Sequence, residues 1–149
     1  MPKYHQLMLP ILEFSKNGEE KSAKETREFL EDYFNLTEEE RNEKISSGQL
    51  RISNRTGWAR SSLKQSGLLE ETKYAHLRIT KLGLELLDSE PERLTRKIIL
   101  EFLEEQLLIN LLKSLFSSLG VKMENLFLLF SSENFLFLPI KLISLFLLE

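Results

Sequence analysis

Residues 51–81 read RISNRTGWARSSLKQSGLLEETKYAHLRITK, and the spacing of their apolar residues changes halfway along. The first half is typical of a helix that begins at Ser53 or Asn54, whose side chains can cap it, and runs to about Gln65. In the second half, apolar residues alternate with polar ones, which predicts a two-stranded hairpin over residues 68–80. We therefore expect a helix followed directly by a β-hairpin.

Helical patterns flank this stretch on both sides. Apolar residues at helical spacing from Leu7 to Phe14 predict a first helix that runs into a stop signal at residues 16–18. S/T-x-x-E capping boxes at Ser22 and Thr37 open two more helices, the second of them short. Thr80 is expected to cap a helix over residues 81–87. The order helix, helix, short helix, helix, hairpin, helix is typical of a winged helix-turn-helix domain, so we expect a mainly α fold with a small β-hairpin wing. The helix after Ser22 is expected to bury Phe29, Leu30, Tyr33 and Phe34.

Composition changes in the last third of the chain. Residues 97–149 hold 31 apolar side chains, seven of the ten Phe and only 10 charged groups. The SEPE sequence at residues 89–92 is a capping box with Pro in the first turn and predicts a long helix, and residues 123–149 are expected to form two further apolar helices. We expect a winged-helix domain over residues 1–96 and an apolar helical extension over residues 97–149.

The net charge of −3 is unevenly distributed along the chain. Residues 13–43 carry 11 acidic and five basic groups, whereas residues 51–81 carry seven basic and two acidic groups. These basic residues fall on the expected helix and hairpin, which are the elements that meet the duplex in helix-turn-helix proteins. Double-stranded DNA is therefore the expected partner. The alternative is a solvated helix face whose charges balance the acidic helices beside it.

Particular residues of this helix and hairpin are candidates for DNA contact. Ala59 and Leu63 are expected to face the core, whereas Arg60 and Lys64, with the same four-residue spacing, are expected on the opposite side. Arg can read guanine and Asn can read adenine in the major groove, and basic residues of the hairpin can bind phosphates. For Trp58 we favour core packing over stacking on a base. The candidate DNA-binding residues are Arg51, Asn54, Arg55, Gly57, Trp58, Arg60, Ser61, Lys64, Lys73, His76 and Arg78.

The sequence carries no signature of catalysis, metal binding or export. It has no Cys, so neither a disulfide nor a thiolate metal site is available, which fits a reducing compartment such as the cytoplasm. His5 and His76 lie far apart, and no Gly-rich phosphate-binding motif occurs, so we expect no catalytic residue, metal or cofactor. The N-terminus lacks the pattern of a signal peptide. Charged and polar residues interrupt the last apolar stretch, so membrane insertion is not expected.

The sequence contains MPKYH at 1–5 followed by Leu9-Pro10, LTEEER at 36–41, NRTGWAR at 54–60, GLLE at 67–70, RIT at 78–80 and GLELL at 83–87. Together these short segments resemble the N-terminal domain of Mrr-type restriction endonucleases. The resemblance extends over residues 1 to about 96 and implies a winged-helix DNA-binding domain that directs a separate C-terminal nuclease domain to modified, typically methylated, DNA. It also implies that Asn54, Arg55, Trp58, Ala59 and Arg60 lie on the helix that approaches the duplex.

The chain departs from this family pattern after residue 96. The nuclease domain of Mrr-type enzymes holds a divalent metal with acidic residues, whereas residues 97–149 contain no Asp and no E-x-K triplet. The hairpin tip also differs, since KYAH at residues 73–76 stands where a Gly-containing tip is typical. We therefore expect a DNA-binding targeting module without a nuclease centre of its own.

Two alternatives stay open at this point. A small dimeric winged-helix transcriptional regulator would bind symmetric half-sites, whereas a restriction-system protein would prefer methylated DNA. An interaction module would instead dock a partner protein or a membrane through the apolar C-terminal third, without salt-dependent DNA binding. Residues 94–119 are the expected surface for a homodimer or for a partner nuclease domain.

Overall fold

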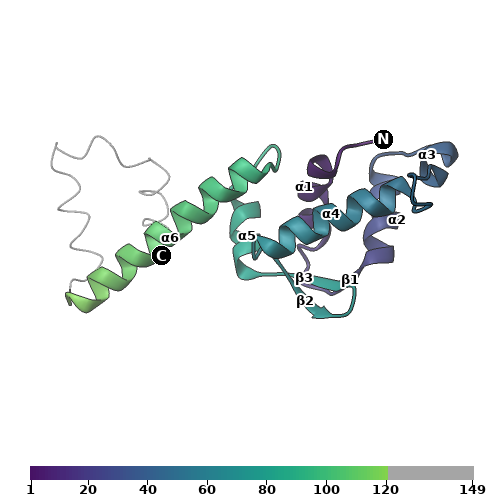
Figure 1. The fold of residues 1–149 in the computed structure, drawn as a ribbon. Coiled ribbons are helices and arrows are strands. Elements are labelled where there is room, and N and C mark those ends of the chain that lie inside the picture. Colours follow the sequence, from purple (N-terminus) through teal and green to yellow (C-terminus); the bar gives the residue numbers. More distant parts are fainter. Residues whose placement is uncertain (121–149) are drawn as a thin grey trace. The chain divides into compact units, whose positions relative to one another are not determined.

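The computed structural model describes residues 1–120, which form mainly helices and one small antiparallel sheet (Figure 1). The first compact unit ends at Ile99 and the second begins at Leu100. The two helices predicted over residues 123–149 lie outside the described residues. The elements are α1 (Tyr4–Phe14), β1 (Lys21–Ser22), α2 (Ala23–Tyr33), α3 (Glu38–Asn42), α4 (Arg51–Gln65), β2 (Leu69–Lys73), β3 (His76–Ile79), α5 (Lys81–Asp88) and α6 (Arg96–Ser118).

Side-chain caps lie at the starts of α2, α3 and α5, where the sequence predicts them. At the start of α2, the Ser22 N–H donates to Glu25 Oε2 at 2.8 Å and the Glu25 N–H donates to Ser22 Oγ at 3.2 Å. Thr37 and Glu40 form the same reciprocal pair at the start of α3. Thr80 Oγ1 accepts a backbone N–H of α5 at 3.1 Å. The two capping boxes and the Thr80 cap are therefore confirmed.

The sheet has three antiparallel strands in the order β1-β3-β2. β2 and β3 are the predicted hairpin, with Leu69 opposite Ile79. β1 pairs with the other edge of β3 and places Lys21 opposite Leu77. The sequence pattern does not predict β1, because a strand of two residues shows no alternation and is defined only by its distant partner. This pairing ties the segment before α2 to the hairpin.

α4 lies at the centre of the first unit. It packs against α1, α2, α3 and β2, and Figure 1 shows it crossing the unit above the sheet. Ile52, Ala59 and Leu63 are fully buried on its inner side, which confirms the predicted core positions Ala59 and Leu63. Contact with four other elements holds α4 in place. The remaining apolar core of this unit consists of Leu7, Met8, Ile11, Leu12, Leu30, Leu36, Leu68, Leu69, Leu77, Ile79, Leu86, Leu87, Leu94 and Ile99.

α4 begins at Arg51, earlier than the predicted start at Ser53 or Asn54. The Arg51 N–H donates to the Glu43 carbonyl at 2.7 Å, and an isolated bridge closes the loop just before the helix. These backbone contacts position the chain, and no side-chain cap is formed at the helix start. The predicted capping residues therefore lie within the first turn of α4.

α6 begins at Arg96, so the predicted helix start at residues 89–92 is wrong. α5 ends just before this segment, and Glu90 has a φ of +49°, outside the right-handed helical region. Glu90 precedes Pro91, and the residue before a proline is disfavoured in the helical conformation because it clashes with the proline ring. Thr95 lies at the start of the helix instead, where its Oγ1 accepts a backbone N–H of α6 at 3.3 Å.

α2 buries fewer aromatic residues than its sequence predicts. Leu30 is fully buried and Phe29 and Phe34 are half-buried, but Tyr33 is 51% exposed. The Phe29 ring stacks on Phe14 of α1 with centroids 4.2 Å apart, which covers part of both rings. Tyr33 contacts Phe29 at a tilted angle, with centroids 5.6 Å apart, and lies toward solvent. The predicted burial of Tyr33 is therefore wrong.

The second unit contains the greater part of α6. Its exposed apolar residues include Leu107, Leu111 and Leu115, which follow one another at four-residue spacing. Leu94 and Ile99, which belong to the expected interaction surface, are instead buried in the first unit. None of the helices described within residues 1–120 combines the length and the apolar character that crossing a membrane requires.

Candidate nucleic-acid interface

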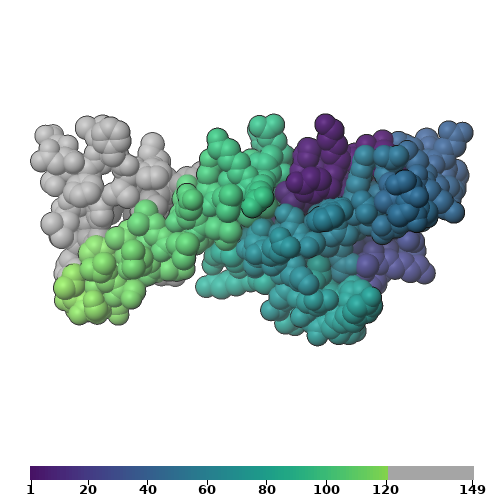
Figure 2. Space-filling view, in the orientation of Figure 1, coloured from purple at the N-terminus to yellow at the C-terminus, as the bar shows by residue number. Residues whose placement is uncertain are grey.

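One side of α4 is left uncovered within the first unit. Asn54, Gly57, Trp58, Ser61 and Lys64 follow along it at the spacing of one helix face. Gly57, Trp58 and Lys64 are exposed, while Asn54 and Ser61 are half-buried. In the space-filling view, α4 can be followed in blue-teal along the surface (Figure 2). We refer to these five residues as the outer face of α4.

Trp58 is 65% exposed and does not pack in the core. The inner side of α4 is formed by Ile52, Thr56, Ala59 and Leu63, whose spacings of three and four residues leave no core position for Trp58. The predicted core packing of Trp58 is therefore wrong. An indole at the surface leaves a large apolar ring and an N–H donor available to a partner.

Gly57 lies in the interior of a helix, where glycine costs about 1 kcal/mol relative to alanine. Its φ is not positive, and a Cβ at this position would meet nothing within 4 Å. Gly83 in α5 is different, since a Cβ there would lie 2.4 Å from the Leu68 carbonyl oxygen. Packing among the described residues therefore requires glycine in α5 but not in α4. A molecule that approaches the α4 backbone closely would require Gly57.

Arg60 is turned into the first unit and is only 7% exposed. Its Nη2 donates to the Ala75 carbonyl at 2.8 Å and to the Lys21 carbonyl at 3.3 Å, so one guanidinium joins α4 to the hairpin tip and to β1. Burial disfavours the charged form and lowers the pKa of Arg60 below the ordinary arginine value. The expectation that Arg60 lies on the outer side with Lys64 is therefore wrong.

Two other candidate arginines also make contacts within the first unit. The Arg55 Nη1 donates to the backbone carbonyls of Met1 and Pro2. The Arg51 Nε lies 2.8 Å from Glu43 Oε1. Both arginines are half-buried. They hold neighbouring segments against α4, and neither is among the five residues that define its outer face.

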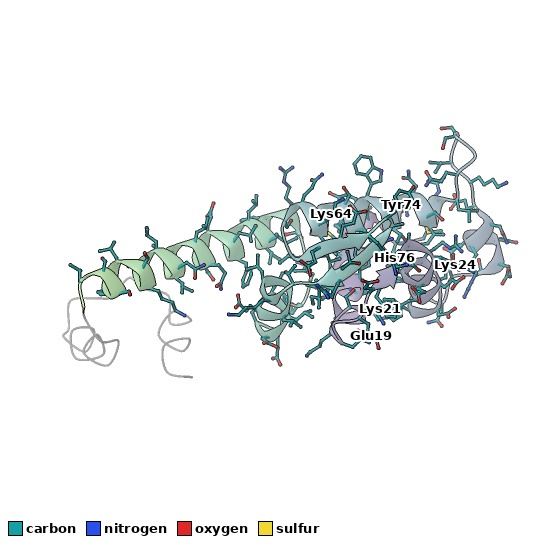
Figure 3. All side chains as sticks on the ribbon, turned by 90° about the horizontal axis from the view of Figure 1, so that it is seen from below. Glu19, Lys21, Lys24, Lys64, Tyr74 and His76 are labelled. Atoms are coloured by element: carbon teal, nitrogen blue, oxygen red, sulfur yellow. The ribbon has the colours of Figure 1, made fainter. Side chains whose placement is uncertain are left out.

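The remaining basic candidates form ion pairs with acidic neighbours at the surface. The hydrogen bond from Lys64 is the main cause that lowers the pKa of Glu71. Exposed pairs of this kind contribute about 0–1 kcal/mol, so other anions can replace their carboxylates at little cost. Figure 3 views the side of the unit on which Lys64 and the hairpin lie. The pairs are Lys64–Glu71 at 2.8 Å, Lys73–Glu20 at 3.0 Å and Arg78–Glu70 at 2.7 Å.

The hairpin tip consists of Tyr74 and Ala75, between β2 and β3. Ala75 has a φ of +60°, so it takes the left-handed conformation that a glycine would adopt with less strain. The Ala75 carbonyl accepts hydrogen bonds from Arg60 and, at 3.0 Å, from the Ala23 N–H. His76 is half-buried, and its Nδ1 lies 2.8 Å from the Tyr74 carbonyl oxygen. The tip without glycine is therefore held by contacts with α4 and α2.

The outer face of α4 offers binding groups rather than reactive ones. The Asn54 amide carries both a donor and an acceptor, the Ser61 hydroxyl can do either, and the Lys64 ammonium is a donor. In the part of the chain that the structure describes, no three His, Asp or Glu side chains are placed so that they could hold a metal ion. The arrangement suits hydrogen bonding to base edges and phosphates.

Comparison with known proteins relates the chain to one family. Residues 4–89 match the family model described as the Mrr N-terminal domain, which confirms the resemblance seen in the sequence. The chain is also similar to the type IV methyl-directed restriction enzyme EcoKMrr of Escherichia coli (strain K12), with 30% identity over 98 residues. The similar region covers 65% of this chain and 32% of the relative, so the chain spans about a third of that enzyme's length. No solved structure matches the chain at a significant level.

Proposed function

The chain belongs to the Mrr N-terminal domain family, and from this premise we propose that its first unit is a winged-helix domain that binds double-stranded DNA. α4 is the proposed recognition helix, and the β2–β3 hairpin is the proposed wing. The order of the helices and strands and the β1-β3-β2 sheet are compatible with this assignment. The proposal assigns binding, and no catalytic step, to residues 1–99.

The observation that carries the proposal is the open backbone at Gly57 beside the exposed ring of Trp58. The major groove of B-DNA is about 12 Å wide and admits a helix. Short side chains such as Asn54 and Ser61 reach base edges only when the helix backbone itself comes close. A residue without a Cβ in the middle of this face supports such a close approach.

We propose that the preferred duplex is methylated. The E. coli relative is described as methyl-directed. A methyl group in the major groove is an apolar feature, and apolar side chains recognise the thymine methyl by contact. Trp58 is the proposed reader of this methyl group, since its exposed indole is the large apolar side chain of the outer face.

The basic residues around the hairpin are proposed to bind phosphates. Lys64, Lys73 and Arg78 lie at the surface in ion pairs, and phosphate oxygens can take the place of the paired carboxylates. Binding to phosphates releases condensed counterions, so affinity falls as salt rises. Each contact of this kind contributes about one to the slope of log K against log salt concentration.

A titration of the full chain with methylated and unmethylated duplexes of one sequence, at two salt concentrations, tests the proposal. We expect tighter binding to the methylated duplex and a smaller salt slope for Lys64→Ala. Lys16→Ala is the matched control, because Lys16 is exposed after α1, beside Leu87 and Pro91. A wild-type protein without salt-dependent binding contradicts the proposal. If Trp58→Ala weakens binding to both duplexes equally, the methyl-reading role is wrong.

The second unit supports a proposed association surface. Leu107, Leu111 and Leu115 are exposed along α6 at the spacing of one helix face. We propose this part of residues 94–119 as the contact for a homodimer or a partner nuclease domain, while Leu94 and Ile99 serve the core of the first unit. Light scattering of the wild type, and of a variant with the three exposed leucines changed to Gln, tests whether this surface forms the homodimer. A monomeric wild type excludes the homodimer.

A further inference from the structure

The hairpin tip presents an aromatic ring on a turn that is fixed by contacts with neighbouring elements. Tyr74 is 93% exposed, so its ring packs against almost nothing within the described residues. Figure 3 shows Tyr74 on the same side of the first unit as Lys64 of α4. Bringing an exposed aromatic ring into contact with another apolar surface is favourable, because it removes apolar area from water. The hairpin tip therefore presents an exposed aromatic ring that is available to a binding partner.

Arg60 fixes this tip relative to α4. Its Nη2 donates to the carbonyl of Ala75, which directly follows Tyr74, and the Ala23 N–H donates to the same carbonyl. The carbonyl of Tyr74 itself lies 2.8 Å from His76 Nδ1. The carbonyls of both tip residues are thus held from α4, α2 and β3. A tip held in this way loses little conformational freedom when it binds.

We expect the buried Arg60 to contribute more to the position of the hairpin tip than to the stability of the protein. Its guanidinium donates to the backbone carbonyls of Lys21 and Ala75, and removing a charged group from water is costly without strong compensation. A neutral side chain of similar length would avoid that cost. Such a neutral side chain would not supply the rigid fork of donors with which arginine reaches both β1 and the hairpin tip from one position on α4.

We propose that Arg60 is a positioning residue and that Tyr74 packs on the uncharged part of a nucleotide, its sugar or base, in the duplex bound by α4. This inference rests on the proposed function. Because the tip is tied to α4, docking of the outer face in the major groove also sets the place of Tyr74 on the duplex. An aromatic contact with a sugar or with the exposed edge of a base adds affinity without releasing counterions.

Substitution of Tyr74 separates this contact from phosphate binding. Tyr74→Ala is expected to weaken duplex binding roughly 5- to 20-fold with an unchanged salt slope, and Tyr74→Phe to stay within about twofold of the wild type. Tyr33→Ala is the matched control, because Tyr33 is an exposed tyrosine on α2, and it should leave affinity unchanged. If the wild type binds DNA and Tyr74→Ala binds it with equal affinity, the inference is wrong. It is also wrong if Tyr74→Ala has a reduced salt slope. Absence of binding by the wild type overturns the proposed function instead.

A double-mutant cycle tests the positioning role of Arg60. Arg60→Met keeps the length of the side chain and removes its donors, and circular dichroism identifies conditions in which each variant is folded. We expect Arg60→Met to weaken binding roughly as much as Tyr74→Ala, and to have less than about a twofold further effect in the Tyr74→Ala background. If the losses of binding free energy caused by Arg60→Met and by Tyr74→Ala add in full in the double variant, the positioning role is wrong. If Arg60→Met does not fold, the same cycle with Arg60→Lys, which keeps the charge but not the fork, decides in the same way.

Discussion

Substitution of Gly57 by alanine should stabilise the protein and weaken its binding to DNA. Gly57 lies inside α4 without a positive φ, and a Cβ there would meet nothing within 4 Å. Alanine in a helix interior is favoured over glycine by about 0.5–1 kcal/mol, because glycine loses more conformational freedom on folding. For a domain of this size, such a gain raises Tm by about 2–8 °C.

The methyl group added at Gly57 lies on the side of α4 that is proposed to enter the major groove. It would hold the helix backbone away from the bases, and the polar groups of Asn54 and Ser61 would no longer reach base edges. A net hydrogen bond is worth about 1 kcal/mol, so losing one or two of them weakens binding roughly 5- to 30-fold. Stability and affinity therefore change in opposite directions.

Thermal unfolding and fluorescence anisotropy of a labelled duplex measure both effects of Gly57→Ala on the same preparation. Lys16→Ala, exposed after α1, is the control for a change outside α4. Higher stability with unchanged affinity would refute close approach of DNA at Gly57. Lower stability would refute the argument that the fold itself does not require this glycine.

Two further substitutions test packing and surface charge. Gly83→Ala should destabilise the protein by about 1–3 kcal/mol, because its Cβ would lie 2.4 Å from the Leu68 carbonyl oxygen, and a denaturation curve that overlays the wild-type curve contradicts this. Lys64→Ala should raise the pKa of Glu71 toward its ordinary value, because the hydrogen bond from Lys64 is the main cause of the lowered pKa. The folded-state pKa of Glu71 is depressed, so this pairing stabilises the protein above the unfolded-state pKa and is lost as pH falls through the folded-state value. An NMR titration of the Glu71 carboxyl carbon measures the shift, and equal values in both proteins rule out the pairing.

Features whose signals are local in the sequence were predictable. The capping boxes at Ser22 and Thr37 and the cap at Thr80 act within one helical turn, and each forms as expected. The β2–β3 hairpin is also local, since its two strands are joined by a two-residue tip. The alternation of polar and apolar residues was therefore enough to identify it.

Features that depend on distant segments were not predictable from spacing. Arg60 and Lys64 are four residues apart, yet Arg60 reaches carbonyls of β1 and of the hairpin tip, and β1 itself has no sequence pattern. Trp58 is exposed because smaller residues already fill the inner side of α4. Its position beside Ala59 in the sequence carries no information on that packing. The residues of the outer face of α4 could therefore be identified only once the buried residues of its inner side were known.

Trp58 allows the central claim, that the outer face of α4 meets the duplex, to be measured without a label on the protein. It is the one tryptophan of the sequence, so its emission reports on this face alone. A titration with duplex DNA should change the Trp58 emission, with the midpoint and salt dependence of the binding curve obtained from anisotropy of labelled DNA. Binding that is seen by anisotropy while the Trp58 emission stays constant would contradict the account.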